Sequence, residues 1–307
     1  MTGLPSARFA RGFALWCAAL ACVGCDALGG SEARGHSEAK GHSEAKGHSE
    51  VAPPPLPQPS APLEDTRATL QRSCPQGMLP VALKAQPSFC VDRYEANLVE
   101  AESGAALAAS QRPLDGVKYR AVSVGGVVPQ AYVNRFEAAA ACEASGKRLC
   151  KAREWYAACS GSEHTKYPYG NKFEKRRCNV DKGHLLHKLF GNVTYTYDAH
   201  YNNPKLNLQP GFLAKTGEYA ECTSEAGAND LMGNLHEWVA DDVSAKLREE
   251  LPLEKGDQWL GKRGMGVFMG GYFSSHGEHG TGCLYVTATH APDYHDYSTG
   301  FRCCVEL

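Results

Sequence analysis

The sequence predicts an α+β fold for residues 73–307. Three features carry this prediction: only two segments have helical spacing, the other apolar runs have the length of short strands, and glycine-rich loops separate them. Helices and strands mixed in this way belong to the α+β class, here with little regular secondary structure. Ten of the 13 cysteines lie in this region, which adds an expectation of several disulfides.

Two helices are expected. The first has Asn134 as its N-cap, with Glu137 completing a capping box, and it stops at Gly146. The second covers residues 151–159 and ends before Gly161. The residues expected on their buried faces are Phe136, Ala140 and Cys142 in the first helix and Trp155, Ala158 and Cys159 in the second.

Strands are expected at residues 121–128, at residues 283–289 and at the terminal FRCCV. Successive side chains of a strand point to opposite faces. Cys303 and Cys304 therefore need different disulfide partners.

Composition limits the possible functions. The chain has 307 residues, of which 43% are hydrophobic and 21% charged, and its formal net charge is -2. These values describe one or two ordinary globular domains. We expect a monomer without a nucleic-acid partner.

The first 25 residues are expected to be a secretory signal. Two arginines precede an apolar run at residues 12–24 that is too short to span a bilayer. The end of this run, ACVGC, is similar to a bacterial lipoprotein box, with Cys25 as the lipidated residue. We expect an exported cell-envelope lipoprotein held to the membrane by its lipid. Lipidation at Cys22, or cleavage near Gly30 with free secretion, is the alternative.

Residues 26–72 are expected to be a disordered linker. A hexapeptide repeat, SEARGH followed by SEAKGH, occupies residues 31–50, and a proline-rich stretch follows at 51–62. These segments have too little apolar surface to offset the entropy of ordering. The repeat contains a histidine every six residues, so metal scavenging is the alternative to a plain tether.

Several sequence blocks in the domain resemble one known family. The blocks are FCVDRYEAN at 89–97, GKRLCKAREW at 146–155, LMGNLHEWVADD at 231–242, a glycine pair at 270–271 and GFRCC at 300–304. In this order they resemble the formylglycine-generating enzyme, or sulfatase-modifying factor, domain, whose fold is related to the C-type lectin fold. The resemblance runs from about residue 74 to residue 307.

The resemblance implies two disulfides, Cys142–Cys303 and Cys159–Cys283. The other six cysteines are then assigned by elimination to Cys150–Cys304, Cys74–Cys90 and Cys178–Cys222.

Working members of this family hold Cu(I) between two thiolates shortly after a GGS turn. Here Ser275 and Gly280 stand at the corresponding positions, and Tyr272 replaces the serine of the turn. A hydroxyl and a glycine cannot hold Cu(I) as thiolates do, so neither copper nor formylglycine formation is expected. Cys283 is the nearest thiol, and it is better explained as the partner of Cys159.

A different transition metal is the alternative. The same loop carries His276, Glu278 and His279, and His290 and His295 follow it. Imidazole and carboxylate ligands favour Zn(II), Cu(II) or Fe(II) over Cu(I). Polar histidines on a surface loop are the plainer interpretation.

The resemblance also implies calcium. The family ligands correspond here to Asp230, the backbone carbonyls of Gly233 and Leu235, and Glu237. Two carboxylates and carbonyls suit a hard cation. A salt bridge from Glu237 to Arg148 or Arg302 is the alternative. A second calcium site would begin at Asn179 and Val180.

Two functions are compatible with these features. As a binding module, the domain would hold a peptide or glycan between the 270–300 loop and the GNLHEW turn. As an enzyme, it would be a formylglycine-generating oxidoreductase or a divergent metal-dependent oxidase, with a metal at the loop histidines or a reduced cysteine as the reactive group. The candidate catalytic residues are Ser275, His276, His279, Cys283 and His236, the last of which replaces the tryptophan of the family GNVWEW turn.

Overall fold

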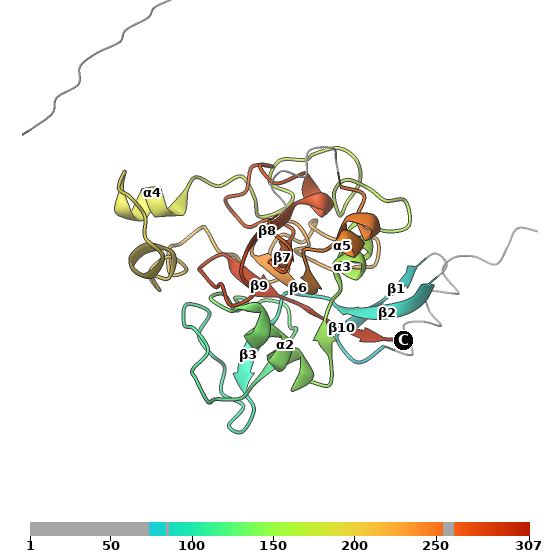
Figure 1. The fold of residues 1–307 in the computed structure, drawn as a ribbon, viewed down its shortest axis with the longest axis horizontal. Coiled ribbons are helices and arrows are strands. Elements are labelled where there is room, and N and C mark those ends of the chain that lie inside the picture. Colours follow the sequence, from blue (N-terminus) through green and yellow to red (C-terminus); the bar gives the residue numbers. More distant parts are fainter. Residues whose placement is uncertain (1–73, 84–85, 254–260) are drawn as a thin grey trace, which may run out of the picture. The chain divides into compact units, whose positions relative to one another are not determined.

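The computed structural model describes residues 74–83, 86–253 and 261–307 (Figure 1). All of these residues belong to the unit that spans residues 58–307. The expected signal and linker, and the expected lipidation site at Cys25, lie outside the described residues.

Short helices and strands alternate with long loops along the domain. The strands are β1 (Met78–Leu83), β2 (Gln86–Asp92), β3 (Asn97–Glu100), β4 (Tyr119–Val122), β5 (Arg148–Leu149), β6 (His236–Asp242), β7 (Gly266–Met269), β8 (Val286–His290), β9 (Thr299–Phe301) and β10 (Cys303–Glu306). The helices are α2 (Arg135–Glu143), α3 (Ala152–Ser160), α4 (Leu185–Phe190) and α5 (Ala245–Glu250), with one π turn, η1 (Tyr197–Tyr201), and one 3-10 turn, η3 (Gly282–Leu284). This mixture confirms the α+β prediction.

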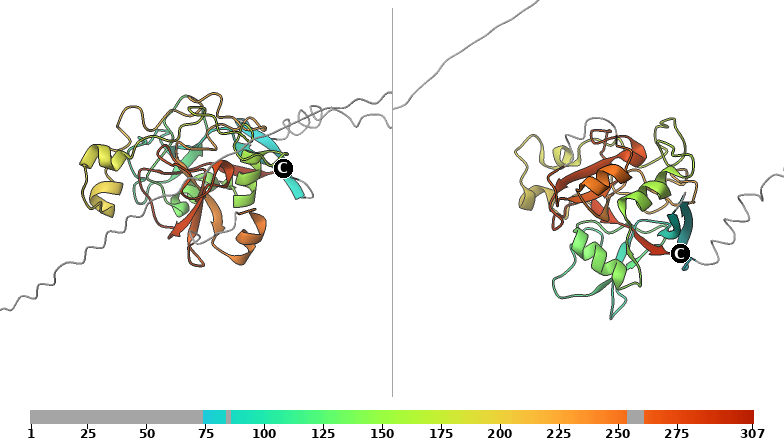
Figure 2. Two further views of the ribbon diagram at one scale, coloured as in Figure 1. Left: turned by 90° about the horizontal axis from the view of Figure 1, so that it is seen from above. Right: turned by 45° about the vertical axis from the view of Figure 1, so that its right-hand side comes forward.

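The domain contains two four-stranded sheets; in Figure 1, β6, β7, β8 and β9 lie near the centre, and β1, β2 and β10 lie toward the C-terminus (Figures 1 and 2). The first has the strand order β1-β2-β10-β5, and its pairings are antiparallel. The second has the order β8-β7-β6-β9, in which β6 and β9 run parallel. A separate sheet pairs β3 with β4. Because β10 follows directly after β9, the end of the chain links the two larger sheets.

Local hydrogen bonds set the ends of the two predicted helices. In α2, Asn134 Oδ1 accepts from the Glu137 N–H (2.9 Å), and Glu137 Oε2 accepts from the Asn134 N–H (2.9 Å). This is the expected capping box. Helix α3 ends at Gly161, where φ is +63°, a backbone conformation that glycine adopts at little steric cost.

The buried face of α2 differs from the expectation, whereas that of α3 agrees with it. Cys142 is buried as expected, but Phe136 is 59% exposed and Ala140 is also exposed. Ala138 and Ala141 face the core instead. Their small side chains share one side of the helix with Cys142 and let α2 pack closely against β4 and β5.

Two expected strands are shorter than predicted. Strand β4 covers only the start of the 121–128 segment, because a turn follows in which Gly126 has a φ of +81°. A Cβ at Gly125 would lie 2.9 Å from the Tyr94 ring, so the turn packs closely against this ring. The 283–289 segment is divided between η3 and β8. The terminal strand is present as β10.

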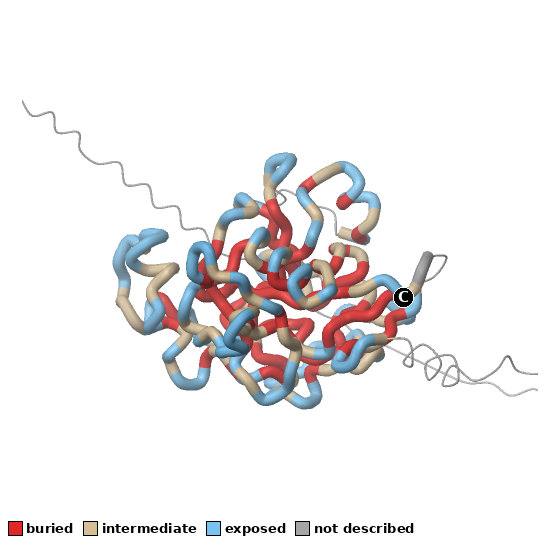
Figure 3. Tube along the Cα trace, turned by 90° about the horizontal axis from the view of Figure 1, so that it is seen from below, coloured by how far each residue is buried: buried red, intermediate tan, exposed pale blue. Residues whose placement is uncertain are grey.

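The hydrophobic core lies against both large sheets. Its largest cluster packs Trp155 of α3 against residues of β1, β2, β10, β7 and β8. A second cluster packs α2 against Trp238 of β6 and Phe301 of β9. Figure 3 shows the buried segments in red through the centre and the exposed loops in pale blue around them.

Five disulfides cross-link these elements. They join Cys74 to Cys90, Cys142 to Cys303, Cys150 to Cys304, Cys159 to Cys283 and Cys178 to Cys222. These are the pairings expected from the sequence, and adjacent cysteines of β10 reach α2 and the residue after β5 respectively. In the chain-entropy account each disulfide stabilises the fold by about 2–4 kcal/mol.

Candidate functional site

A cavity of about 390 Å³ opens where the loop after β7 meets the 167–181 segment. Ser275 and Gly280 both line it. These are the residues that stand where the resemblance implies two thiolates. The structure therefore keeps an open site at the implied reactive centre and supplies it with a hydroxyl and a glycine.

The glycine pair after β7 shapes the edge of this cavity. Gly270 has a φ of +86°, and a Cβ there would lie 2.9 Å from the Trp155 ring. Gly271 has a φ of +73°, and its Cβ would lie 2.9 Å from Ser275 Oγ. Ser275 Oγ also accepts a hydrogen bond from the Tyr272 N–H (2.9 Å). The Ser275 hydroxyl therefore helps to hold the turn.

Cys283 has no free thiol. It is bonded to Cys159, and both residues are fully buried. All ten cysteines of the described ranges are paired in the same way. Cys283 is therefore the disulfide partner that was expected, and the alternative of a reduced Cys283 as the reactive group of an enzyme does not fit this bond.

The predicted loop residues His276 and Glu278 have protein partners. His276 Nδ1 lies 2.6 Å from Asp181 Oδ1. Glu278 Oε2 accepts from the His276 N–H (2.7 Å), and Oε1 accepts from the Tyr285 hydroxyl (2.7 Å). Burial opposes ionisation of Glu278, but hydrogen bonds from its own backbone, from Tyr285 and from His276 outweigh burial and lower its pKa.

His236 lies in an aromatic environment. Its ring centroid is 4.6 Å from that of Phe268, 5.0 Å from that of Tyr272 and 5.7 Å from that of Tyr285. Its Nδ1 has no hydrogen-bond partner among the described residues. Burial, with smaller contributions from neighbouring histidines, holds the pKa of His236 well below its usual value. A neutral imidazole therefore fills the position of the family tryptophan.

The other histidines considered for a transition-metal site each contact an aromatic side chain. His279 packs against Tyr285, with ring centroids 5.7 Å apart. His290 stacks on Tyr294 at 3.9 Å, and the Nδ1 of His295 lies 2.7 Å from the Tyr197 hydroxyl. Within residues 74–83, 86–253 and 261–307, no three His, Cys, Asp or Glu side chains group closely enough to hold a metal. The residues do not fit the transition-metal site considered for this loop.

Glu237 is part of a buried ion pair. Arg302 donates from Nε to Oε2 and from Nη2 to Oε1 of Glu237, both at 2.6 Å, and Trp155 Nε1 donates to Oε2 at 2.7 Å. The side chains of the pair are 0% and 1% exposed. Arg148, the other expected partner, pairs with Glu154 instead. Both oxygens of Glu237 accept from Arg302, which is the salt-bridge alternative to the role of calcium ligand.

Two further carboxylates lie close to this ion pair. Glu95 accepts from Asn234 Nδ2 (2.5 Å) and from the Leu235 N–H (3.0 Å), and Asp230 accepts from the Gly217 N–H (2.7 Å). Burial raises the pKa of Asp230 to about 6. Burial, then repulsion from the neighbouring carboxylates, raises the pKa of Glu95 well above its usual range. The charge of the Arg302 guanidinium lowers the pKa of both carboxyl groups, although burial keeps both raised.

The calcium prediction now depends on backbone carbonyls and two polar side chains. At the first position, Asp230 and the backbone carbonyls of Gly233 and Leu235 remain the candidate calcium ligands. At the second position, Asn179 Nδ2 donates to its neighbours, but its buried Oδ1 has no hydrogen-bond partner within the described ranges. An orphaned oxygen of this kind is a ligand type that calcium accepts, and Val180 follows it beside the cavity. Calcium therefore stays a prediction.

Sequence reasoning missed several residues that line the cavity. Tyr167, Phe173 and Asp181 belong to loops without a motif. One signal could have indicated the first of them. Because Cys159 was expected to pair with Cys283, the chain shortly after Cys159 had to lie near that loop, and the Cys283 N–H indeed donates to the Lys166 carbonyl (2.9 Å).

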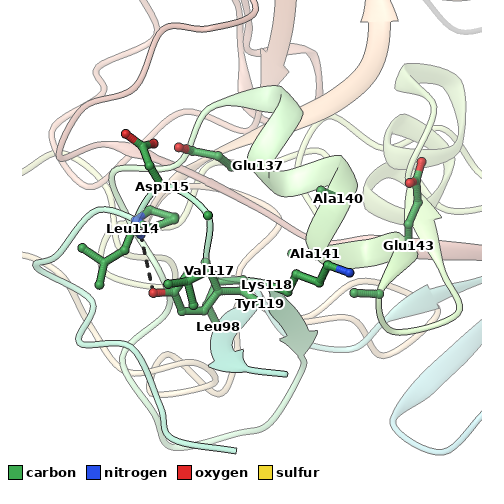
Figure 4. A pocket seen from close by; sticks show the side chains of 13 residues that line it. Leu98, Leu114, Asp115, Val117, Lys118, Tyr119, Glu137, Ala140, Ala141 and Glu143 are labelled. Atoms are coloured by element: carbon green, nitrogen blue, oxygen red, sulfur yellow. Dashed lines mark hydrogen bonds between the residues drawn. The ribbon is translucent and has the colours of Figure 1, made fainter. Parts of the chain in front are cut away.

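Two other cavities lie beside the loop that precedes β4. One, of about 470 Å³, is bounded by this loop and α2 (Figure 4). Leu114 and Tyr119 line it, and Figure 4 shows Asp115 and Glu137 together at one edge. The other, of about 570 Å³, shares Leu114. Neither is lined by Ser275 or Gly280, so the resemblance does not point to them.

Comparisons with known proteins agree with this description. The chain matches the family model of the sulfatase-modifying factor enzyme 1-like domain over residues 87–307. It is 29% identical over 133 residues to Inactive C-alpha-formylglycine-generating enzyme 2 of Bos taurus, and 27% identical over 134 residues to the protein of that name from Mus musculus. Each match covers 43% of this chain and 38% of the relative, so the matched region is well under half of these curated relatives.

Solved structures with a similar arrangement include PvdO from Pseudomonas aeruginosa and CarF. The first has 16% identity and a TM-score of 0.41, covering 75% of this chain and 92% of PvdO. The second has 15% identity and a TM-score of 0.41, covering 76% of this chain and 99% of CarF. The family match spans more than two thirds of the sequence and includes every motif block. The chain therefore belongs to the family of proteins with a sulfatase-modifying factor enzyme 1-like domain.

Proposed function

We propose that this protein is a non-catalytic member of its family that binds a peptide or glycan in the cavity lined by Ser275 and Gly280. One observation carries the proposal. The two positions of the reactive thiolates hold Ser275, whose hydroxyl accepts a hydrogen bond within a turn, and Gly280, and the nearby Cys283 is in a disulfide. Without thiolates the site lacks the pair of soft ligands that holds Cu(I) in working members of the family. The cavity is still open, and its side chains can bind a ligand.

The names of the matched relatives support a non-catalytic role. Both are called inactive formylglycine-generating enzymes. The cavity itself has a volume within the range of about 300–1,000 Å³ that is common for ligand sites. It combines aromatic and polar groups, among them Tyr167, Tyr285 and Asp181, as sites for peptides and glycans do.

Two measurements on the full chain test this proposal. In the first, a peptide library and a glycan array are probed with the wild-type protein and with His276→Trp, which places a large ring in the cavity from its exposed edge. Binding should be present in the wild type and lost in His276→Trp. The matched control is His187→Trp, an exposed position of α4 outside the cavity, and it should bind as the wild type does.

The second measurement addresses catalysis. The copper-treated full chain is incubated with a sulfatase-motif peptide, and the peptide is analysed by mass spectrometry. We expect unchanged peptide. Formylglycine in the product would contradict the proposal, and so would the absence of any bound peptide or glycan in the first measurement.

We also propose that the protein is an exported lipoprotein anchored through Cys25. The five disulfides fit an exported protein, since cytosolic thiols are kept reduced. Among the helices of the described ranges, none is long and apolar enough to cross a membrane. Detergent partitioning of the wild type and of Cys25→Ala, with Cys22→Ala as the control, tests the anchor. Unchanged partitioning of Cys25→Ala would contradict it.

A further inference from the structure

The cavity lined by Ser275 and Gly280 is rich in aromatic side chains. Tyr167, Phe173 and Tyr285 contribute rings to its lining, and Met232 contributes a thioether. The ring centroids of Tyr167 and Phe173 are 5.7 Å apart, and the rings are inclined by 55°. Tyr169 stacks on Tyr167 with ring centroids 5.6 Å apart, and the Phe173 ring is 41% exposed. Aromatic faces attract cations through their electron density.

A carboxylate completes the edge of this surface. Asp181 is 40% exposed, and its Oδ1 lies 2.6 Å from His276 Nδ1. The other oxygen, Oδ2, makes no hydrogen bond among the described residues and is available to a ligand. No lysine or arginine of the described ranges lines the cavity. The fixed charge of the lining is therefore negative.

A second carboxylate acts through the Tyr285 ring. The Tyr285 hydroxyl donates to Glu278 Oε1 (2.7 Å), and burial, reinforced by this carboxylate, raises the pKa of Tyr285. The phenol thus stays protonated while it donates to an ionised acceptor. Such a charge-assisted hydrogen bond pushes electron density into the ring, which strengthens the attraction of its face for a positive charge.

We propose that this cavity recognises a cationic side chain of a peptide, with its aliphatic stem against Met232 and Val180 and its charge among the three rings beside Asp181. This inference rests on the proposed binding function and specifies the class of ligand. The volume of about 390 Å³ is larger than one side chain, so a neighbouring residue of the peptide has room as well.

The test compares three ligands that differ at one position. The isotope-labelled full chain is titrated with acetyl-Gly-X-Gly-amide, where X is lysine, norleucine or glutamate, and binding is followed by NMR. Norleucine has an aliphatic stem like that of lysine but no charge. We expect the lysine peptide to bind about tenfold more tightly than the norleucine peptide, from cation–π attraction and one partly screened carboxylate. The glutamate peptide should bind most weakly.

Variants assign the effect to the cavity. Asp181→Asn keeps the size of the side chain and tolerates the φ of +63° at this position. It should weaken lysine binding about fivefold and leave norleucine binding unchanged. Phe173→Leu, at a ring that is 41% exposed, should weaken lysine binding about threefold. The matched controls are Asp115→Asn and Phe136→Leu, which lie outside this cavity and should have no effect.

The outcomes separate this inference from the function on which it rests. Equal affinity for lysine and norleucine would overturn the inference of cation recognition while leaving peptide binding intact. A glycan that binds, while none of the three peptides does, would also overturn the inference. Failure of every peptide and glycan, in this titration and in the array, would overturn the proposed function itself.

Discussion

Replacing Arg302 with methionine tests how much the Arg302–Glu237 ion pair, which joins the GNLHEW turn to the end of the chain, contributes to stability. Arg302 lies between β9 and β10 and makes two hydrogen bonds to Glu237 on β6. It also donates to three backbone carbonyls, of Asp92, Arg93 and Asn229. Methionine keeps an unbranched stem of similar reach but removes the charge and all donors, so the substitution isolates the guanidinium.

The expected loss of stability follows from burial. Removing one partner of a buried ion pair typically costs about 3–5 kcal/mol, because the remaining charge is left without compensation. Here the two side chains are 0% and 1% exposed, so the cost should lie at the upper end of this range. The carbonyls that lose their donor add to the cost. For a domain of this size, such a loss should lower Tm by about 10 °C.

The assay is equilibrium unfolding in guanidinium chloride with the disulfides intact, followed by tryptophan fluorescence. The matched control is Arg112→Met, which breaks the Arg112–Glu137 pair, where the side chains are 48% and 21% exposed. Because water and salt screen such a pair, its loss should cost less than about 1 kcal/mol. The double variant Glu237→Gln/Arg302→Met should lose less unfolding free energy than the two single variants lose together, because it leaves neither charge without its partner.

The pH dependence gives an independent check. Arg302 lowers the pKa of Asp230 and of Glu95, although burial keeps both raised. Without Arg302 these carboxylates should hold their protons to higher pH in the folded state, so the deficit of Arg302→Met should grow from about pH 5 to about pH 8. A deficit within 1 kcal/mol of that of Arg112→Met, or one that shrinks as pH rises, would refute this reasoning.

Three further predictions concern other parts of the domain. His236→Phe should make the free energy of unfolding less sensitive to acid. Burial lowers the pKa of His236 in the folded state, so below about pH 6.5 the unfolded chain binds more protons than the folded chain. As the pH decreases, this difference lowers the stability of the wild type by about 1.4 kcal/mol per pH unit. Urea unfolding at several pH values measures it; the exposed control His187→Phe should keep the wild-type slope, and an unchanged slope in His236→Phe would count against it. Gly270→Ala should cost about 2–4 kcal/mol by calorimetry, from its φ of +86° and a contact at 2.9 Å. At Gly104 φ is +72° and nothing lies within 4 Å of an added Cβ, so Gly104→Ala should lose only the stability that backbone strain costs. Equal losses of stability in the two variants would contradict a packing contribution at Gly270. Calcium in large excess over its dissociation constant should raise Tm, by the equivalent of about 2.7 kcal/mol at a hundredfold excess, and Asp230→Asn should diminish the rise; no change with calcium or with a chelator would remove the ion from consideration.

Local signals explain which parts of the fold could be predicted. The capping box of Asn134 and Glu137 involves residues three apart, so the start of α2 depends on its own sequence. The opposite faces of β10 follow from strand geometry, which is why Cys303 and Cys304 could be given separate partners. The exposed Phe136 could not be predicted, because the rotation of α2 depends on which strands its small residues meet.

The sequence by itself determined the family and the α+β class, and it predicted that the thiolates are absent, because these depend on residue identity and on spacing along the chain. Only the tertiary structure decided that Glu237 pairs with Arg302 and that Asp181 and Tyr285 line the same cavity as Ser275. Glu237 and Arg302 are far apart in the chain, and so are Asp181 and Tyr285. Their distances are set by the packing of two sheets and five disulfides, and no short-range pattern encodes them.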